Sequence, residues 1–460
     1  MSRPLRVAIV GSGPAGVYAS DALMKSGREV SIDLYEKMPA PFGLIRYGVA
    51  PDHPRIKGII RSLHRVLDKP EVRLIANVEF GKDITLDEMK ELYDAVVFAT
   101  GAVGDRDLDV PGADLEGHHG AGEFVGFYDG NPLFKRDWDL SAESVAVVGV
   151  GNVGLDVARI LAKTGDELHV TEIPDNVYES LRTNKAREVH VFGRRGPAQA
   201  KFTPLEIREL GQADDVDIVV YPEDFEFDEG SMEAIRTSNQ VKQVTKTLTD
   251  FTLREDTGAK RRLHLHFLEA PVEIVGDEET GVTALRTERQ ELDGSGGVNG
   301  TGKTTDWPMD AVYRAVGYFG TKLPELPFDE RRGVITNIEG RVIDGESMAT
   351  AQAEDHIPGL YTTGWIKRGP VGLIGHTKGD ALETIGHIIE DFEAGRLPQP
   401  AKPEEDAIVD LLADKGIDYI DWEGYHRIEA AEKAAGEPHG RERIKLATRE
   451  AMVEAAKKMA

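Results

Sequence analysis

Two glycine-rich turns, each placed directly after a short apolar run, constrain this chain more than any other feature. The first is GSGPAG at residues 11–16 after RVAIV, and the second is GVGNVG at residues 149–154 after SVAVV. A buried strand, a glycine turn and a helix in this order begin a dinucleotide-binding unit. We therefore predict an α/β chain with two Rossmann-like, three-layer dinucleotide-binding domains.

In the first fingerprint each glycine has a distinct task. Gly11 allows the tight turn, Gly13 lets the backbone approach a pyrophosphate, and Gly16 lets the helix pack closely on the strand. The pyrophosphate would lie on free N–H groups at the helix N-terminus, where the helix dipole favours negative charge. Glu36 ends the next apolar run, at the distance where an acid accepts the ribose hydroxyls. The motif alone could be an ordinary glycine-rich turn, but this context favours a site for FAD or NAD.

The second fingerprint has the same frame, with Gly149, Gly151 and Gly154, but a different pair of residues follows it. The next strand, EVHVFGRRG, ends without an acid and offers Arg194 and Arg195. Arginines suit the 2′-phosphate of NADP, which an acid would repel. The alternative is an ordinary solvated pair of arginines after a strand. Alanine is frequent at the third position of NADP sites, so Gly154 leaves NADH use open. Two different nucleotide sites in one chain indicate a flavin-dependent oxidoreductase.

The composition excludes several classes of protein. The chain of 460 residues contains no cysteine, so it holds no redox-active dithiol, catalytic thiol or cysteine-bound iron–sulfur cluster. Its formal net charge of −26 disfavours binding to nucleic acid or anionic membranes. No apolar run approaches the ~20 residues of a membrane helix, and the N-terminus runs directly into the first expected strand. We therefore expect a cytoplasmic protein.

The order of segments predicts a discontinuous first domain. Residues 1–108 hold the first fingerprint, and residues 326–460 return to the same domain, with helices from about 404 onward. Residues 109–325 form the second domain, in which the glycine-rich stretch 293–304 is expected to be a loop. The segment GLYTTGWIKRGPVGLIGHTKGDALETI predicts a strand, a glycine-rich turn and a helix from about Thr377. Such a turn can cap a flavin ring.

Six collinear segments are more specific than the fingerprints. They are GSGPAG, FGLIRYGVAPDHPRIK, GNVGLDVARIL, VFGRRGPAQAKFTPLEIREL, GWIKRGPVGLIG and AAGEPHGRERIKLA. Together they resemble the adrenodoxin reductase family, and more closely its bacterial FprA-type ferredoxin–NADP reductases. The resemblance spans essentially the whole chain and implies the glutathione-reductase-like flavoprotein architecture. The departures are Gly154, where the family usually has alanine, and Phe42, where a tryptophan often stands.

The resemblance also implies the residues of each site. The residues expected to bind FAD are Gly11, Gly13, Ala15, Gly16, Glu36, Leu44, Val78, Trp365, Gly372, Leu373 and Ile374. Those expected to bind NADP are Gly149, Gly151, Asn152, Val153, Gly154, Leu155, Arg194, Arg195, Glu206 and Gly372. His53 and Glu209 match the pair near the nicotinamide, where an imidazole can bind the carboxamide or relay a proton. The alternatives are a histidine that stabilises the APDHP turn and two solvated acids on one helix face.

The implied reaction is hydride transfer from NADPH to FAD, followed by single-electron transfer to a ferredoxin, or the reverse. Such a ferredoxin can feed a cytochrome P450. Because ferredoxins are acidic, we expect a local basic docking face. Its candidates are Arg182, Lys185, Arg187, Lys242, Lys246 and Arg254. Two other functions stay open at this point, namely an NADPH-dependent flavin monooxygenase and a non-catalytic nucleotide-binding subunit.

The two histidines in the segment LHLHF are candidate metal ligands. His264 and His266 alternate along an expected strand, so their side chains share one face. Two histidines without a third ligand are more often structural than metal-binding, and we therefore expect no metal.

Overall fold

The chain divides into two compact units. The computed structural model describes residues 3–372 and 374–457, so Leu373, one of the expected FAD contacts, lies outside the described residues. One unit consists of Met1–Gly104 with Tyr318–Ala460, and the other of Asp105–Gly317. We expected the chain to pass from one unit to the other slightly later, at 108–109 and 325–326. The second crossing comes early because Gly317 follows strand β14 (Ala311–Arg314) almost directly, and its φ of 120° redirects the chain.

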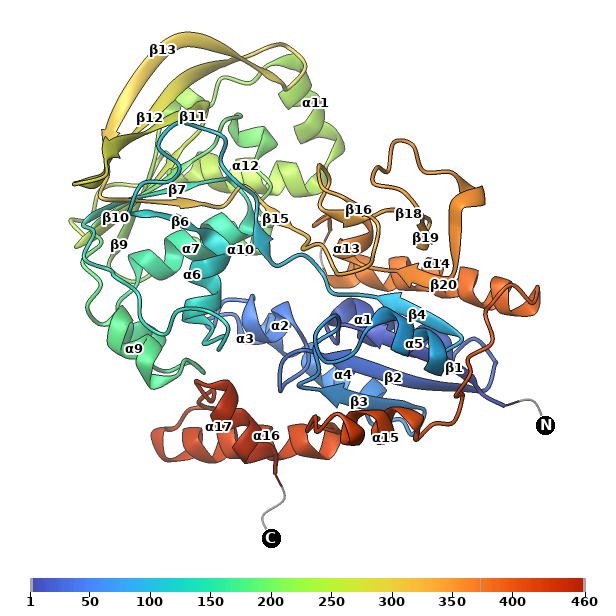
Figure 1. Cartoon of the computed structure of the whole chain (residues 1–460). Helices are drawn as coiled ribbons and strands as arrows, with labels where there is room; N and C mark the ends of the chain where they lie inside the picture. The colour runs from blue at the N-terminus through green and yellow to red at the C-terminus, as the bar shows by residue number, and fades with distance from the viewer. Residues whose placement is uncertain (1–2, 373, 458–460) are drawn as a thin grey trace. The chain divides into compact units, whose positions relative to one another are not determined.

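A mainly parallel sheet forms the centre of the first unit (Figure 1). Its strands, among the described residues, run in the order β18 (Asn337–Ile338), β19 (Arg341–Ile343), β20 (His356–Thr362), β4 (Ala95–Phe98), β1 (Leu5–Val10), β2 (Val30–Glu36) and β3 (Val72–Ala76). Strand β1 is central, with Val7 opposite Ala95 on one side and Ile32 on the other. The strands from β20 to β3 are parallel, whereas β18 and β19 are antiparallel additions.

The side chains of β1 alternate between two apolar layers. Leu5, Val7 and Ile9 join a core cluster that includes α1 (Pro14–Met24) and α14 (Ile374–Glu393). The intervening residues of β1 join a second cluster with α5 (Leu86–Leu92) and α15 (Ala407–Asp414). A strand that is apolar on both faces must be covered on both, which produces the three layers. The other short elements of this part are α2 (Leu44–Tyr47), α3 (Pro54–Lys57), α4 (Ile60–Leu67), α13 (Trp365–Arg368), β5 (Gly104–Asp105), β15 (Tyr318–Phe319), β16 (Phe328–Asp329) and β17 (Val334–Ile335).

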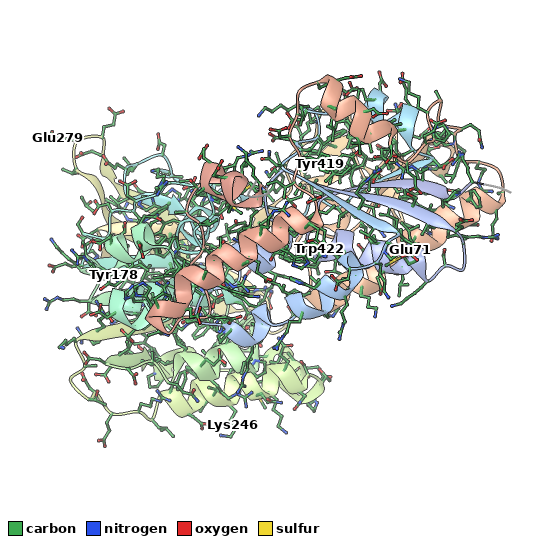
Figure 2. All side chains as sticks on the ribbon, turned by 90° about the horizontal axis from the view of Figure 1, so that it is seen from below. Glu71, Tyr178, Lys246, Glu279, Tyr419 and Trp422 are labelled. Atoms are coloured by element: carbon green, nitrogen blue, oxygen red, sulfur yellow. The ribbon has the colours of Figure 1, made fainter. Side chains whose placement is uncertain are left out.

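The C-terminal part adds helices to the first unit, as expected for the region after 404. They are α15, α16 (Trp422–Gly436) and α17 (Arg449–Ala456). Trp422, labelled in Figure 2, donates from its indole N–H to Asp68 at 2.9 Å. Arg46 of α2 and Glu432 of α16 form a buried ion pair, and Lys445 Nζ donates to the carbonyl of Arg46 at 2.6 Å. Helix α16 thereby anchors the segment that carries Leu44.

The second unit holds a parallel sheet and a smaller antiparallel one (Figure 1). In the described residues the parallel sheet has the order β6 (His118–Gly120), β14, β7 (Ser144–Val148), β8 (Glu188–Phe192), β10 (Arg261–His266) and β9 (Val216–Val220). The antiparallel strands are β11 (Glu269–Asp277), β12 (Gly281–Leu292) and β13 (Val298–Pro308). The helices are α6 (Ala121–Tyr128), α7 (Asn152–Ala162), α8 (Gly165–Leu168), α9 (Asp175–Leu181), α10 (Pro204–Leu210), α11 (Glu229–Thr237) and α12 (Asn239–Phe251).

Strand β13 corrects the expected loop at 293–304. The loop is confined to the turn before Val298, because the threonines that follow pair with β12, for example Thr304 with Glu288. Threonine favours strands, and this preference outweighs the glycines between them. None of the helices in the described parts of the chain has the length and apolar character that crossing a bilayer requires.

Candidate functional site

The expected FAD residues lie at one edge of the first unit's sheet. Gly11 follows β1, Glu36 is the last residue of β2, Val78 comes shortly after β3, and Trp365 comes shortly after β20. These strands are parallel, so their carboxyl ends meet at the same edge. The fold thus brings together residues that are far apart in the sequence.

The start of α1 offers an open cradle for a phosphate. Gly11 has a φ of 110°, and a Cβ there would lie 2.5 Å from the carbonyl oxygen of Ala99, so only glycine fits. Gly13 caps α1 without any side-chain hydrogen bond, and the nearest atom to a Cβ on it would be 4.0 Å away. The N–H of Val17 bonds to Gly13, whereas those of Ala15 and Gly16 have no acceptor among the described residues. Two free donors at a helix N-terminus fit a pyrophosphate.

Glu36 is fixed beside this cradle. Its carboxylate accepts from Ser12 Oγ at 2.7 Å and from the N–H of Met38 at 3.0 Å. Glu36 is half-buried, and each carboxylate oxygen can accept a further hydrogen bond. The position therefore suits the hydroxyls of an adenosine ribose. Val78, in contrast, is buried, and its N–H donates to the carbonyl of Glu36 at 3.0 Å.

The turn that carries Trp365 is held from behind by a buried acid. Asp380 of α14 accepts from the N–H of Gly364 and pairs with Lys367 at 3.0 Å and with Arg368 at 2.7 Å. Gly364 in turn lies against Ala15, because a Cβ on Gly364 would be 2.6 Å from the methyl group of Ala15. The indole of Trp365 is half-buried and stacks on Tyr318 with ring centroids 6.1 Å apart. The turn is thus fastened to both α1 and α14.

Four further candidates lie in the loops and at the helix starts of the first unit. Gly372 has a φ of 85° and is exposed, and Ile374 begins α14, three residues before the expected start at Thr377. Leu44 begins α2 and is half-buried. His53 is buried, and its backbone caps α3 by accepting from the N–H of Ile56 at 3.2 Å. The backbone of His53 thus takes part in the APDHP turn, in line with the alternative role considered for this residue.

The second unit repeats the cradle at the start of α7. Gly149 has a φ of 136°, and a Cβ there would lie 2.2 Å from the carbonyl oxygen of Ala315. Gly151 caps α7 without a side-chain hydrogen bond, and no atom lies within 4 Å of a Cβ built on it. The N–H of Leu155 bonds to Gly151 at 3.1 Å, so the free donors are those of Asn152, Val153 and Gly154.

The presence of glycine at position 154 is explained by local packing rather than by the nucleotide. A Cβ at this position would lie 2.3 Å from the carbonyl oxygen of Gly149. An alanine would therefore push the helix away from its strand. The departure from the usual alanine follows from this close packing.

Three cationic side chains lie after β8 and along the segment that follows it. Arg194 is exposed and Arg195 is half-buried, and within the described residues neither guanidinium has an ion-pair partner. Lys201, which the sequence analysis did not single out, forms a β-bridge with Gly151, and its N–H donates to the carbonyl of Val150 at 2.9 Å. A lysine nine residues after the end of β8 gives no signal in one sequence, because only the bridge places it beside the cradle. These cations fit a nucleotide that carries several phosphates.

The same segment leads into the helix that carries the two acids. The Asn152 side chain accepts from the N–H of Thr203 at 2.9 Å, and Thr203 caps α10 by accepting from Glu206 at 3.3 Å. Glu206 is buried, with one oxygen 3.8 Å from Arg159, and Glu209 is half-buried. Asn152 thereby couples the phosphate cradle to α10. The burial of Glu206 does not fit the alternative of a solvated helix flank.

Comparisons with known proteins agree with this architecture. Residues 5–190 match the family described as pyridine nucleotide-disulphide oxidoreductase. The chain is 40% identical to NADPH-ferredoxin reductase FprA of Mycobacterium tuberculosis, over 97% of this chain and 98% of that protein. It is 36% identical to mitochondrial NADPH:adrenodoxin oxidoreductase of Homo sapiens, over 96% of this chain and 90% of that protein.

A solved structure matches the whole fold. Mycobacterium tuberculosis FprA in complex with NADPH aligns with a TM-score of 0.90 at 39% identity, covering 99% of this chain and 100% of that chain. The predicted α/β fold with two dinucleotide-binding domains is confirmed. The predicted relationship is confirmed as well, over nearly the full length of each protein. This chain belongs to the family of NADPH-dependent ferredoxin and adrenodoxin reductases.

Proposed function

We propose that the chain is an FAD-containing NADPH:ferredoxin oxidoreductase. One observation carries the proposal: two helices, α1 and α7, begin at uncapped glycines with free N–H groups, and their surroundings differ in charge. Glu36 stands beside the first cradle, and two arginines without ion-pair partners, within the described residues, follow β8 near the second. Membership in the family supports FAD for the first cradle and NADP(H) for the second.

The residues of the first unit would bind and orient FAD. The pyrophosphate would lie on the N–H groups of Ala15 and Gly16, and the ribose would bind Glu36. The Trp365 turn and the start of α14 would face the ring system, and the dipole of this 20-residue helix favours negative charge at its N-terminus. Bound FAD supplies the chemistry of taking two electrons as a hydride and passing them on singly.

The residues of the second unit would select and hold NADPH. Arg194 and Arg195 would bind the 2′-phosphate, and the N–H groups of Asn152 to Gly154 would bind the pyrophosphate. Glu206 and Glu209 of α10 would approach the nicotinamide end, together with Gly372. We assign His53 and Glu209 to the nicotinamide carboxamide, where a ring nitrogen of His53 donates or accepts a proton.

The partner we propose is a ferredoxin-type iron–sulfur protein. The names of the related reductases support this class of acceptor. We further propose that the ferredoxin feeds a cytochrome P450 and that the reaction takes place in the cytoplasm. The absence of cysteine means that the iron–sulfur centre must be supplied by that partner.

An anaerobic visible spectrum of the purified protein tests the proposal. We expect an oxidised-flavin spectrum that NADPH bleaches rapidly and NADH slowly, and we expect the reduced protein to reduce a ferredoxin. A colourless protein, or a flavin that neither nucleotide reduces, contradicts the proposal. Nucleotide binding without any turnover would indicate the non-catalytic alternative. NADPH oxidation that depends on oxygen and an organic substrate would indicate the monooxygenase.

A further inference from the structure

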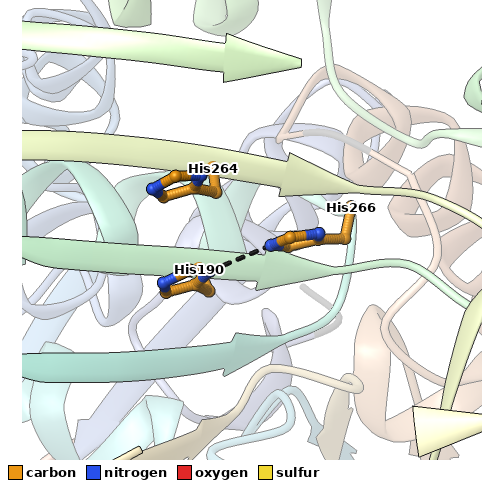
Figure 3. A group of neighbouring side chains, drawn as sticks. All are labelled: His190, His264 and His266. Atoms are coloured by element: carbon orange, nitrogen blue, oxygen red, sulfur yellow. Dashed lines mark hydrogen bonds between the residues drawn. The ribbon is translucent and has the colours of Figure 1, made fainter. Parts of the chain in front are cut away.

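A third histidine joins the two that the sequence analysis noted. His190 on β8 lies directly opposite His264 on β10 in the parallel register, and His266 follows on the same face of β10. Figure 3 shows the three imidazoles on one side of the sheet, and one nitrogen from each lies within 4.8 Å of the others. The expectation of no metal rested on the lack of a third ligand, and the fold supplies one from a neighbouring strand.

Aromatic side chains pack against part of the cluster. His264 and His266 are 7% and 3% exposed. The ring of His266 lies 4.6 Å from that of Phe192 and 4.6 Å from that of Trp307, between centroids. Neighbouring imidazoles are costly to bury unless their nitrogens are satisfied. Aromatic rings line one part of the cluster, whereas His190 is only half-buried.

All three rings are held in the form that binds metals. Burial lowers the pKa of His190 to about 3 and that of His266 to about 2, and it also lowers the pKa of His264. The rings are therefore neutral at pH 7, and a neutral imidazole has a nitrogen lone pair to donate.

The hydrogen bonds of His264 match those of a metal ligand. Its Nε2 lies 2.8 Å from Glu188, whose carboxylate is also paired with Arg262 at 2.6 Å. A carboxylate only accepts, so Nε2 carries the proton and Nδ1 presents its lone pair, to which Tyr221 now donates at 2.9 Å. A carboxylate behind a histidine is the usual support for a metal-binding imidazole.

The other two rings are separated by nearly the right distance. His190 Nδ1 and His266 Nε2 share one hydrogen bond of 2.9 Å (Figure 3). Two nitrogens bound to one tetrahedral zinc ion stand about 3.3 Å apart, so the gap needs to open only slightly. His264 stacks parallel to His190 with centroids 4.3 Å apart, and one of its ring nitrogens lies within 4.8 Å of a nitrogen of each of the other two rings.

We propose that His190, His264 and His266 form a binding site for a divalent transition metal, best suited to Zn²⁺, that ties β8 to β10. Three imidazoles are a common zinc ligand set, and Tyr221 or water completes the fourth position. The metal takes the place of the hydrogen bond between His190 and His266, and the ring that donates this bond moves its proton to its other nitrogen, so that both rings stay neutral. The site serves the stability of the second unit and takes no part in electron transfer.

Zinc titration of the FAD-loaded full chain tests the proposal. The protein is treated with chelator, titrated with ZnCl₂ by calorimetry, then desalted and analysed for metal. We expect about one zinc ion per chain to be retained, with a higher Tm. His266→Asn should abolish retention, and Glu188→Gln should weaken zinc binding by about 10–100-fold. His439→Asn removes an exposed histidine elsewhere and should leave binding unchanged.

Two outcomes overturn the proposal. One is a wild-type protein that retains no zinc, and the other is retention that His266→Asn and Glu188→Gln leave unchanged. If the His266 variant does not fold, X-ray absorption of the zinc-loaded wild type decides, because about three imidazole ligands are required. A spectrum with fewer than three imidazoles rejects the site. NADPH-dependent dye reduction by the metal-free protein should persist throughout, which separates this test from that of the proposed function.

Discussion

Arg195 is the residue whose replacement probes the second nucleotide site most directly. It is half-buried after β8 and has no ion-pair partner within the described residues. A charge-assisted hydrogen bond to phosphate contributes about 1.5–3 kcal/mol, so Arg195→Gln should raise the KM for NADPH about 10–100-fold. The KM for NADH, which lacks the 2′-phosphate, should hardly change. Steady-state dye reduction with both nucleotides measures this, with Arg236→Gln on α11 as the control. An equal rise in the KM for NADPH and NADH would mean that Arg195 does not bind the 2′-phosphate.

His119 gives the second unit a pH-dependent stability. Burial between Trp138 and Tyr313, helped by the charge of Lys135, lowers its pKa to about 4 from 6.5. The unfolded chain therefore binds a proton between these values that the folded chain does not. Stability should be full above pH 6.5 and fall by up to about 3 kcal/mol as the pH drops to 4. Urea unfolding of the wild type and His119→Gln at several pH values should show a flatter curve for the variant. Parallel curves would contradict this account.

At the scale of elements, the Trp365 turn depends on one carboxylate. Asp380 is buried and binds the Gly364 N–H, Lys367 and Arg368, all from that turn. Asp380→Asn removes the buried one of the two counter-charges of Lys367 and the partner of Arg368, so we expect a loss of about 3–5 kcal/mol in unfolding free energy and faster FAD release. Flavin fluorescence during thermal unfolding reports both effects.

Glu383 provides the matched control for this prediction. It also pairs with Lys367, but its side chain is 49% exposed. Glu383→Gln should therefore cost only about 0–1 kcal/mol. Equal effects of the two variants would mean that the buried pair does not hold the turn.

For the whole molecule, the sequence predicted what depends on local pattern. The two fingerprints, Glu36 and the arginines after β8 follow from strand, turn and helix signals within about 50 residues. The structure adds what depends on strand order. Lys201 reaches the second cradle through a bridge to Gly151, and His190 meets His264 through the pairing of β8 with β10. Neither contact has a signature in a single sequence, because the partners come from separate strands or loops. The loop expected at 293–304 became β13 for the same reason, since only β12 supplies its pairing.

The net charge of the whole molecule decides how an acidic ferredoxin can approach. At −26 the chain repels such a partner at long range, so docking depends on local cations. The six candidates do not form one group, because Figure 1 shows α9, which precedes Arg182, well apart from α12 in the same unit. Arg182 is also paired with Glu179 at 2.9 Å. Lys185 and Arg187 precede β8, at the opposite end of that strand from the arginines of the nucleotide site.

Among the expected basic residues, we therefore predict that those at the start of α12 contact the ferredoxin. Gln240 of α12 donates to the carbonyl of Phe202 at 3.2 Å, directly before α10, and Lys242 follows within one turn. Lys246, labelled in Figure 2, lies one turn further and is exposed, with its ammonium paired to Asp250 at 2.6 Å on the same helix. The double change Lys242→Glu and Lys246→Glu should slow ferredoxin reduction about tenfold at low salt and flatten its salt dependence. NADPH-dependent dye reduction should stay unchanged. The control is the double change Lys185→Glu and Arg187→Glu, which alters the net charge by the same amount at the far end of β8. It should have little effect on ferredoxin reduction. Equal slowing by both double variants would indicate that only net charge matters and that α12 is not the docking site.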